Sequence, residues 1–137
     1  HPRISGVVVA LDPADEHWPL MAYADHPGLC RVDGGDERCN SVLNALELVA
    51  GEEADTDWVL VHDAARPCLR GEDVDLLLSA LSSHPVGGLL GVRVRDTMKQ
   101  VGAGGAVQRT VPRDDLWHAF TPQMFHLGLL RRALRDE

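Results

Sequence analysis

Long apolar runs are missing from this sequence of 137 residues. No stretch approaches the ~18–20 consecutive apolar residues that a membrane-spanning helix requires, so we expect no membrane span and no membrane partner. The sequence also lacks an initiator methionine and a charged leader followed by an apolar segment, since it begins at His1. The length fits one domain with a real core, and the start leads us to expect an excerpt of a longer polypeptide.

The sequence contains few cysteines, and their spacing shows no pairs. The three cysteines, at positions 30, 39 and 68, are an odd number and contain no CxxC pattern. Because zinc sites and disulfide frameworks show paired spacing, the pattern favours reduced thiols in a cytoplasmic protein. The seven histidines lack ligand spacing as well, and surface or core roles are expected for them. His62 is singled out because it lies beside the motif described below.

Basic residues are fewer than acidic residues in the sequence as a whole. The net charge of −8 disfavours nucleic acid as a partner. Residues 91–113 are the exception, because they contain five basic residues and one acidic residue, a net charge of +4. A basic segment in an acidic protein suits the binding of a small anion, but a solvated loop of mixed charge explains it equally well.

Strand-like and helix-like patterns alternate along the chain. Short β-branched runs predict strands, and apolar stripes at three- and four-residue steps predict helices. The strands are expected at residues 4–11, 29–32, 58–61 and 86–94, and the helices at 37–50, 72–82 and 127–134. Glycines at 102, 104 and 105 separate two β-prone segments, which predicts a protruding hairpin. The alternation favours an α/β fold with a parallel sheet.

The most informative stretch is WVLVHDAARP at residues 58–67. An apolar strand delivers Asp63 at its carboxyl end, where open α/β sheets bind ligands. Asp63 could hold Mg²⁺, which prefers carboxylate oxygen and keeps substrate phosphates as further ligands. Arg66 offers a planar fork of donors suited to phosphate, and the small Ala64 and Ala65 leave room for a ligand to approach the backbone. The structural alternative is an Asp–Arg pair that ties down a loop.

Three further stretches carry polar groups. The Gly-Gly turn at residues 34–35 exposes backbone N–H groups before a helix start, although an ordinary tight turn explains this pair alone. Near the glycine-rich turn, Thr97 could hydrogen-bond a phosphate and Arg113 could neutralise it. Residues 117–123 (WHAFTPQ) precede the last helix, where a packed tryptophan and a loop fixed by proline are reasonable.

Taken in order, DGGDERxxSV, VLVHDAARPCL, VRDTMK and LWHAFTPQ closely resemble the motifs of the 2-C-methyl-D-erythritol 4-phosphate cytidylyltransferase family. The similarity covers essentially the whole chain, and HDAARP is its most specific motif. The resemblance implies an α/β fold with a Rossmann-like nucleotidyltransferase sheet and a protruding β-arm, incomplete in this chain. Residues 1–137 would then be a partial nucleotidyltransferase domain, in which about residues 95–113 form the arm of a homodimer.

The resemblance implies an activity as well. A phosphate oxygen of methylerythritol phosphate attacks the α-phosphorus of CTP in line and expels pyrophosphate, in the non-mevalonate isoprenoid pathway. Such a reaction needs positioning and charge neutralisation more than covalent help. Mg²⁺ is the implied cofactor, because it and cationic side chains absorb the charge that builds on the α-phosphate.

Individual roles follow from the same resemblance. The implied nucleotide-binding residues are Gly35, Asp36, Arg38, Ser41 and Ala64, with Ser41 and Asp36 nearest the base and Ala64 as a backbone contact. The implied catalytic residues are Asp63, which is also the Mg²⁺ ligand on the triphosphate side, and Arg66. The implied substrate-binding residues are Arg66, Thr97, Arg113 and Thr121, partly across the dimer interface.

Two parts of the family pattern are absent from this sequence. No glycine-rich basic loop of the AAGxGxRM type precedes Ile4. The C-terminal segment that supplies an active-site lysine in the family is also absent from this sequence. Because the loss of one preorganised charge-stabilising donor costs about 10²–10³ in rate, we expect no turnover from this chain alone. Two alternatives stay open: a cytidylyltransferase for another polyol phosphate such as ribitol 5-phosphate, and a non-catalytic nucleotide-binding or dimerisation module.

Overall fold

The computed structural model describes residues 1–50 and 55–136. Its elements are β1 (Val7–Leu11), η1 (Trp18–Leu20), β2 (Leu29–Asp33), α1 (Arg38–Ala50), β3 (Trp58–Val61), α2 (Gly71–Leu81), β4 (Gly87–Arg93), β5 (Met98–Val101), β6 (Val107–Val111), β7 (Trp117–His126) and α3 (Leu127–Arg135). The predicted helices and strands are therefore present, with ends that differ by a few residues. Within the described ranges, no helix is long and apolar enough to cross a membrane.

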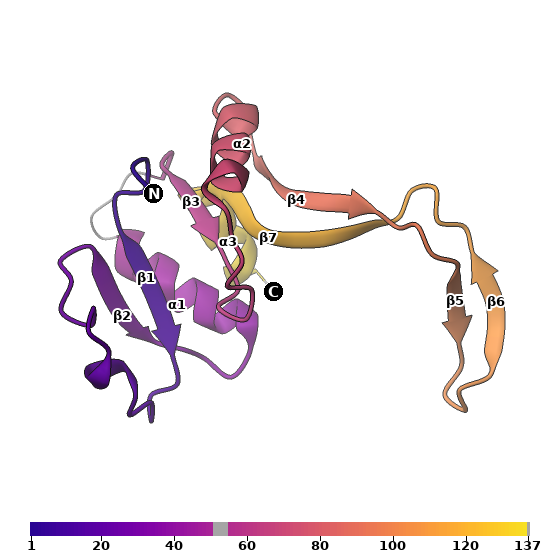
Figure 1. The fold of residues 1–137 in the computed structure, drawn as a ribbon, viewed down its shortest axis with the longest axis horizontal. Coiled ribbons are helices and arrows are strands. Elements are labelled where there is room, and N and C mark those ends of the chain that lie inside the picture. The colour runs from indigo at the N-terminus through magenta and orange to yellow at the C-terminus, as the bar shows by residue number, and fades with distance from the viewer. Residues whose placement is uncertain (51–54, 137) are drawn as a thin grey trace.

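The strands of the body form two sheets (Figure 1). β1 and β2 pair in parallel, from Val7 opposite Leu29 to Leu11 opposite Asp33. In the other sheet β7 lies between β3 and β4 and is antiparallel to both. The expectation of a parallel sheet is thus confirmed for β1 and β2 and wrong for the second sheet.

The reason for the difference is β7, a strand of ten residues where a proline-fixed loop was expected. Pro122 has no N–H for a sheet ladder, so it should demote a central strand. The β4–β7 register, however, jumps from Leu89 opposite Gln123 to Gly91 opposite Ala119. Pro122 therefore lies in an irregular stretch of the pairing, where no ladder hydrogen bond is required of it.

The main core lies between α2 and the sheet of β3, β7 and β4. Val74, Leu77 and Leu78 form the buried stripe of α2 and cluster with Met124 of β7. These α2 positions belong to the predicted apolar face, so that prediction is confirmed. Leu127, at the start of α3, is fully buried, and it anchors the helix that packs against α1.

The predicted hairpin is present and stands away from the body. β4 and β7 continue as a long two-stranded ribbon, and beyond it β5 and β6 pair in antiparallel fashion (Figure 1). The Gly105 N–H donates to the Gly102 carbonyl oxygen at 2.9 Å. Gly105 has a φ of +75°, which L side chains rarely adopt, so the turn requires glycine there.

We predict that Met124→Ala destabilises the fold, because its side chain is only 1% exposed in the core cluster. Truncation of a buried methionine typically costs about 2–5 kcal/mol of unfolding free energy. Met98→Ala is the matched control, since Met98 lies on the arm and is 37% exposed. Denaturant unfolding followed by circular dichroism measures both changes, and an equal loss in the two variants would contradict this placement of the core.

Candidate functional site

Asp63 lies just beyond the carboxyl end of β3, with its side chain 32% exposed. Its Oδ1 accepts a hydrogen bond from Arg38 Nε at 3.0 Å, and its Oδ2 accepts one from Arg66 Nε at 3.3 Å. The carboxylate is therefore at the rim of the sheet, as expected, rather than sealed in the core. It is shared between two guanidinium groups, one of which comes from the start of α1.

The two arginines also control the charge of Asp63. The hydrogen bond from Arg38 is the largest cause that lowers the pKa of Asp63 below its usual 3.8, and Arg66 acts in the same direction. Partial burial opposes them by raising the pKa, but the net shift is downward. Asp63 is consequently a carboxylate at neutral pH, the form that a hard cation or a guanidinium can bind.

The Gly-Gly turn before α1 is held by Ser41. The Gly35 N–H donates to Ser41 Oγ at 3.0 Å, and a Cβ at position 35 would lie only 2.3 Å from the Asn40 Cβ. Glycine is thus required because the turn packs directly against the helix start. This packing places Arg38 beside Asp63, and it leaves Asp36 exposed in the same turn.

Thr121 of β7 meets the HDAARP segment from the other side. Its Oγ1 accepts a hydrogen bond from the Asp63 N–H at 3.2 Å and lies 3.0 Å from His62 Nδ1. The Arg66 guanidinium lies 5.6 Å from the centre of the Phe120 ring. The structure therefore brings Thr121 and Arg66 together with Asp63.

An open cleft of about 750 Å³ adjoins these residues, and its lining includes His62, Arg66, Phe120 and Thr121. The sequence singled out His62 only for its position, and it gave Phe120 no role at the site. The contact between His62 and Thr121 joins residues 59 positions apart, so no local pattern could reveal it. The contact follows from the antiparallel pairing of β3 with β7, which is known only from the folded structure.

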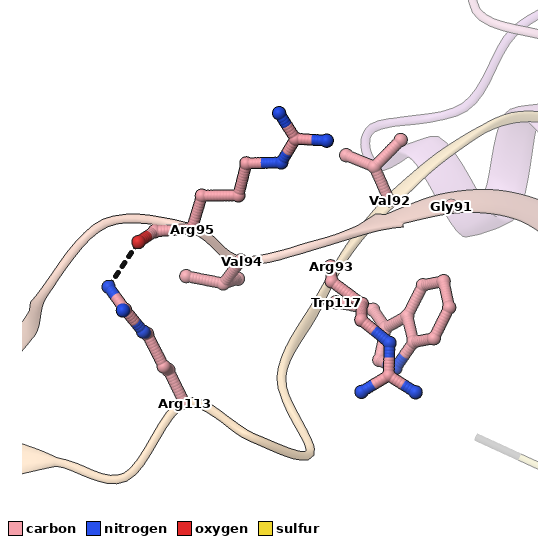
Figure 2. Close-up of a pocket in the computed structure, with 7 residues that line it drawn as sticks. All are labelled: Gly91, Val92, Arg93, Val94, Arg95, Arg113 and Trp117. Atoms are coloured by element: carbon pink, nitrogen blue, oxygen red, sulfur yellow. Dashed lines mark hydrogen bonds between the residues drawn. The ribbon is translucent and has the colours of Figure 1, made fainter.

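Two expected site residues lie elsewhere, on the arm. Thr97 is exposed just before β5, and Arg113 follows β6. Figure 2 shows Arg113 directed at the backbone carbonyl of Arg95, to which it donates a hydrogen bond. Figure 1 shows the arm extending away from the body that holds Asp63. Within one chain, the structure does not bring Thr97 or Arg113 to the Asp63 site.

Arg113 lines a separate cavity of about 590 Å³ at the base of the arm. Arg93 and Trp117 line it too, with the guanidinium 4.9 Å from the centre of the indole ring (Figure 2). Trp117 is 54% exposed, so the expected packed tryptophan is wrong. The reason is that residue 117 starts β7 on the ribbon, where an arginine rather than the core covers the ring.

Comparison with known sequences gives a family for the whole chain. The family model for "IspD: 2-C-methyl-D-erythritol 4-phosphate cytidylyltransferase" matches residues 1–137. The Pseudomonas putida (strain W619) protein named 2-C-methyl-D-erythritol 4-phosphate cytidylyltransferase is 55% identical over 137 residues, which cover 99% of this chain and 58% of that relative. The Vibrio vulnificus (strain CMCP6) protein of the same name is 49% identical over 136 residues, with coverages of 99% and 57%. The chain thus spans somewhat more than half the length of these relatives.

Solved structures agree with the sequence comparison. A crystal structure of 4-diphosphocytidyl-2C-methyl-D-erythritol synthase matches with a TM-score of 0.87 and 36% identity, over 100% of this chain and 66% of that one. The Francisella tularensis 2-C-methyl-D-erythritol 4-phosphate cytidylyltransferase matches with a TM-score of 0.85 and 36% identity, over 99% and 60%. The fold is that of these nucleotidyltransferases, incomplete relative to them, and the chain belongs to the 2-C-methyl-D-erythritol 4-phosphate cytidylyltransferase family.

Proposed function

We propose that this chain supplies the nucleotide-facing part of a cytidylyltransferase. The enzyme transfers the cytidylyl group of CTP to 2-C-methyl-D-erythritol 4-phosphate and releases pyrophosphate, as a step of the non-mevalonate isoprenoid pathway. The observation that carries this proposal is the Asp63 carboxylate at the rim of β3, held between the guanidinium groups of Arg38 and Arg66. Family membership supports the choice of the two substrates.

The charge at this rim suits a bound phosphate chain. Two guanidinium groups and one carboxylate leave one excess positive charge. Both arginines use Nε for Asp63, and the Nη groups of a guanidinium are further donors for phosphate oxygen. Arg38 and Arg66 can therefore neutralise charge that develops on the α-phosphate, which is the main requirement of phosphoryl-type transfer.

The nucleoside is assigned to the turn between β2 and α1. Asp36 is exposed there, and its carboxylate can accept hydrogen bonds from an amino or hydroxyl group of cytidine. Ser41 and Gly35 hold the turn in shape through their own hydrogen bond. The Ala64 backbone, next to Asp63 and without a bulky side chain, is assigned as a further contact to the nucleotide.

Mg²⁺ is the proposed cofactor, and Asp63 is the residue that would hold it. Among the described residues no group of three or more His, Cys, Asp or Glu side chains could hold a metal ion. One carboxylate is a donor set that fits Mg²⁺, because this ion is usually bound by one or two carboxylates together with substrate phosphates and water. When bound, the ion would supply positive charge to the phosphates.

Thr97 and Arg113 are assigned to the site of a second copy of the chain. The hairpin of β5 and β6, next to which both residues lie in the sequence, extends away from β3 of the same chain (Figure 1). Both residues can therefore serve as phosphate ligands where another copy presents the sheet edge that holds its Asp63. The proposed assembly is a homodimer joined through residues 95–113.

The three cysteines are free thiols in the structure, which supports the proposal that the protein is located in the cytoplasm.

We predict that Asp63→Asn lowers the rate of pyrophosphate release by about 10²–10³, because the carboxylate that organises both arginines is lost. The assay uses CTP, methylerythritol phosphate and Mg²⁺ with a polypeptide that contains this chain and the flanking segments its relatives have. Glu47→Gln is the matched control, since it removes a carboxylate that pairs with Arg135 at 2.6 Å in the contact between α1 and α3.

Three results of this assay would contradict the proposal. Equal rates for Asp63→Asn and Glu47→Gln would remove Asp63 from the chemistry. Faster release with ribitol 5-phosphate would reassign the polyol. CTP binding without any pyrophosphate release would favour a nucleotide-binding module.

We also predict that Arg38→Ala raises the pKa of Asp63 toward its usual 3.8, and that Arg66→Ala raises it less, because Arg38 supplies the largest cause of the shift. A carboxyl whose folded pKa is lowered contributes stability above its unfolded pKa, and that stability is lost as pH falls through the folded pKa. Carbon NMR titration of the Asp63 carboxyl measures the shift. An unchanged or lowered pKa in Arg38→Ala would contradict the assigned cause.

A third prediction concerns the shared site. If Arg113 acts on the partner's rim, Arg113→Ala and Asp63→Asn inactivate different sites, and a mixed dimer of the two variants keeps one intact site. Co-expression should then restore about one quarter of the wild-type rate, because half of the dimers are mixed and one of their two sites works. Failure of the mixture to exceed either variant alone would place both residues in the same subunit's site.

A further inference from the structure

His62 lines the cleft, but the reaction proposed above assigns no role to it. We propose that His62 is a positioning residue, which fixes the Thr121 hydroxyl so that Thr121 accepts a hydrogen bond from a hydroxyl group of the polyol substrate. The inference rests on the proposed function and deepens it, because it names which part of a polyol phosphate this side of the cleft recognises.

The first step is the position of the proton on the His62 ring. Its Nε2 lies 2.9 Å from the backbone carbonyl oxygen of Arg66. A carbonyl oxygen only accepts hydrogen bonds, so Nε2 must be the nitrogen that carries the proton. A neutral imidazole has one N–H group, and Nδ1 is therefore left as an acceptor.

The second step is the direction of the Thr121 hydroxyl. Its Oγ1 lies 3.0 Å from His62 Nδ1, which can only accept, so the hydroxyl proton is donated to the ring. The Asp63 N–H, at 3.2 Å, occupies one lone pair of the same oxygen. A hydroxyl oxygen has two lone pairs, and Thr121 therefore keeps one free acceptor position and no free donor.

The third step is the chemistry that such an oxygen selects. Thr121, His62 and Arg66 all line the cleft. An ionised phosphate presents acceptors only, so it gains nothing from Thr121 and binds instead to the guanidinium of Arg66. A hydroxyl group of the polyol can donate, and it satisfies the remaining lone pair of Thr121. The arrangement thus separates recognition of the polyol hydroxyl from recognition of the phosphate.

His62 also contacts both of the residues that carry out these two kinds of recognition. Its ring contacts the Arg66 carbonyl on one side and the Thr121 hydroxyl on the other. Arg66 in turn contacts the Asp63 carboxylate. A change at the ring therefore alters the hydroxyl recognition directly and the position of Arg66 through its backbone, and two variants can separate these effects.

The test compares His62→Asn with His62→Gln in the polypeptide used for the pyrophosphate assay. The Asn side chain can place its oxygen near the position of Nδ1 and keep an acceptor for Thr121, whereas the Gln amide reaches the position of Nε2 and keeps a donor for the Arg66 carbonyl. We expect His62→Gln to raise the KM for methylerythritol phosphate about tenfold, and His62→Asn to raise it less than about threefold. The KM for CTP should stay unchanged in both.

Thr121→Val completes the comparison, since it removes the hydroxyl at nearly constant volume. It should raise the same KM in the parent protein and add little in the His62→Gln background, because the interaction is already lost there. Equal KM values for His62→Asn and His62→Gln, or fully additive effects of His62→Gln and Thr121→Val, would overturn the proposal.

A nitrogen NMR spectrum of the unsubstituted polypeptide used for the assay gives a readout that needs neither a variant nor turnover. The neutral ring of His62 should show its proton on Nε2, and a proton on Nδ1 would overturn the proposal. This result is independent of the assay. Absence of pyrophosphate release would defeat the proposed function, whereas a misplaced ring proton would defeat only the role of His62.

Discussion

The carboxylate of Asp63 joins the segment that follows β3 to the start of α1 through its contacts with two arginines. Arg38 follows β2 of the parallel sheet, and Asp63 follows β3 of the antiparallel one. Isolated surface ion pairs contribute little to stability, so the importance of this contact is geometric rather than energetic. By sharing one carboxylate, the two arginines place their remaining donors on the same rim, and the Gly-Gly turn, the cleft and Thr121 are arranged around it.

The sequence predicted most of the elements, because their signals are local. The apolar stripe of α2 and the glycines of the hairpin turn are readable within a dozen residues. β7 was not readable in this way, because Pro122 argues against a central strand. Its strand character depends on β3 and β4, which flank it and accommodate the proline in an irregular part of the ladder. Tertiary pairing overrode the local rule.

The site shows the same division between local and distant information. Asp63 was found from the sequence because an apolar strand ends just before it, and the structure places its side chain at the edge of the sheet. Its partner Arg38 lies 25 positions away, and Thr121 meets His62 because Val61 pairs with Gln123 across β3 and β7. A register between strands is a property of the assembled sheet, so these contacts followed only from coordinates. The roles that resemblance gives to Thr97 and Arg113 stay predictions.

The irregular pairing near Gly91 has a consequence for the distant hairpin. A Cβ at this position would lie 3.1 Å from the His118 carbonyl oxygen, so the ribbon is closely packed where its register changes. β-bulges bend a strand and increase its twist. A small rotation of the ribbon near Gly91 therefore displaces the hairpin at its far end by a larger distance. The direction of the hairpin is consequently set at Gly91, six positions before Thr97.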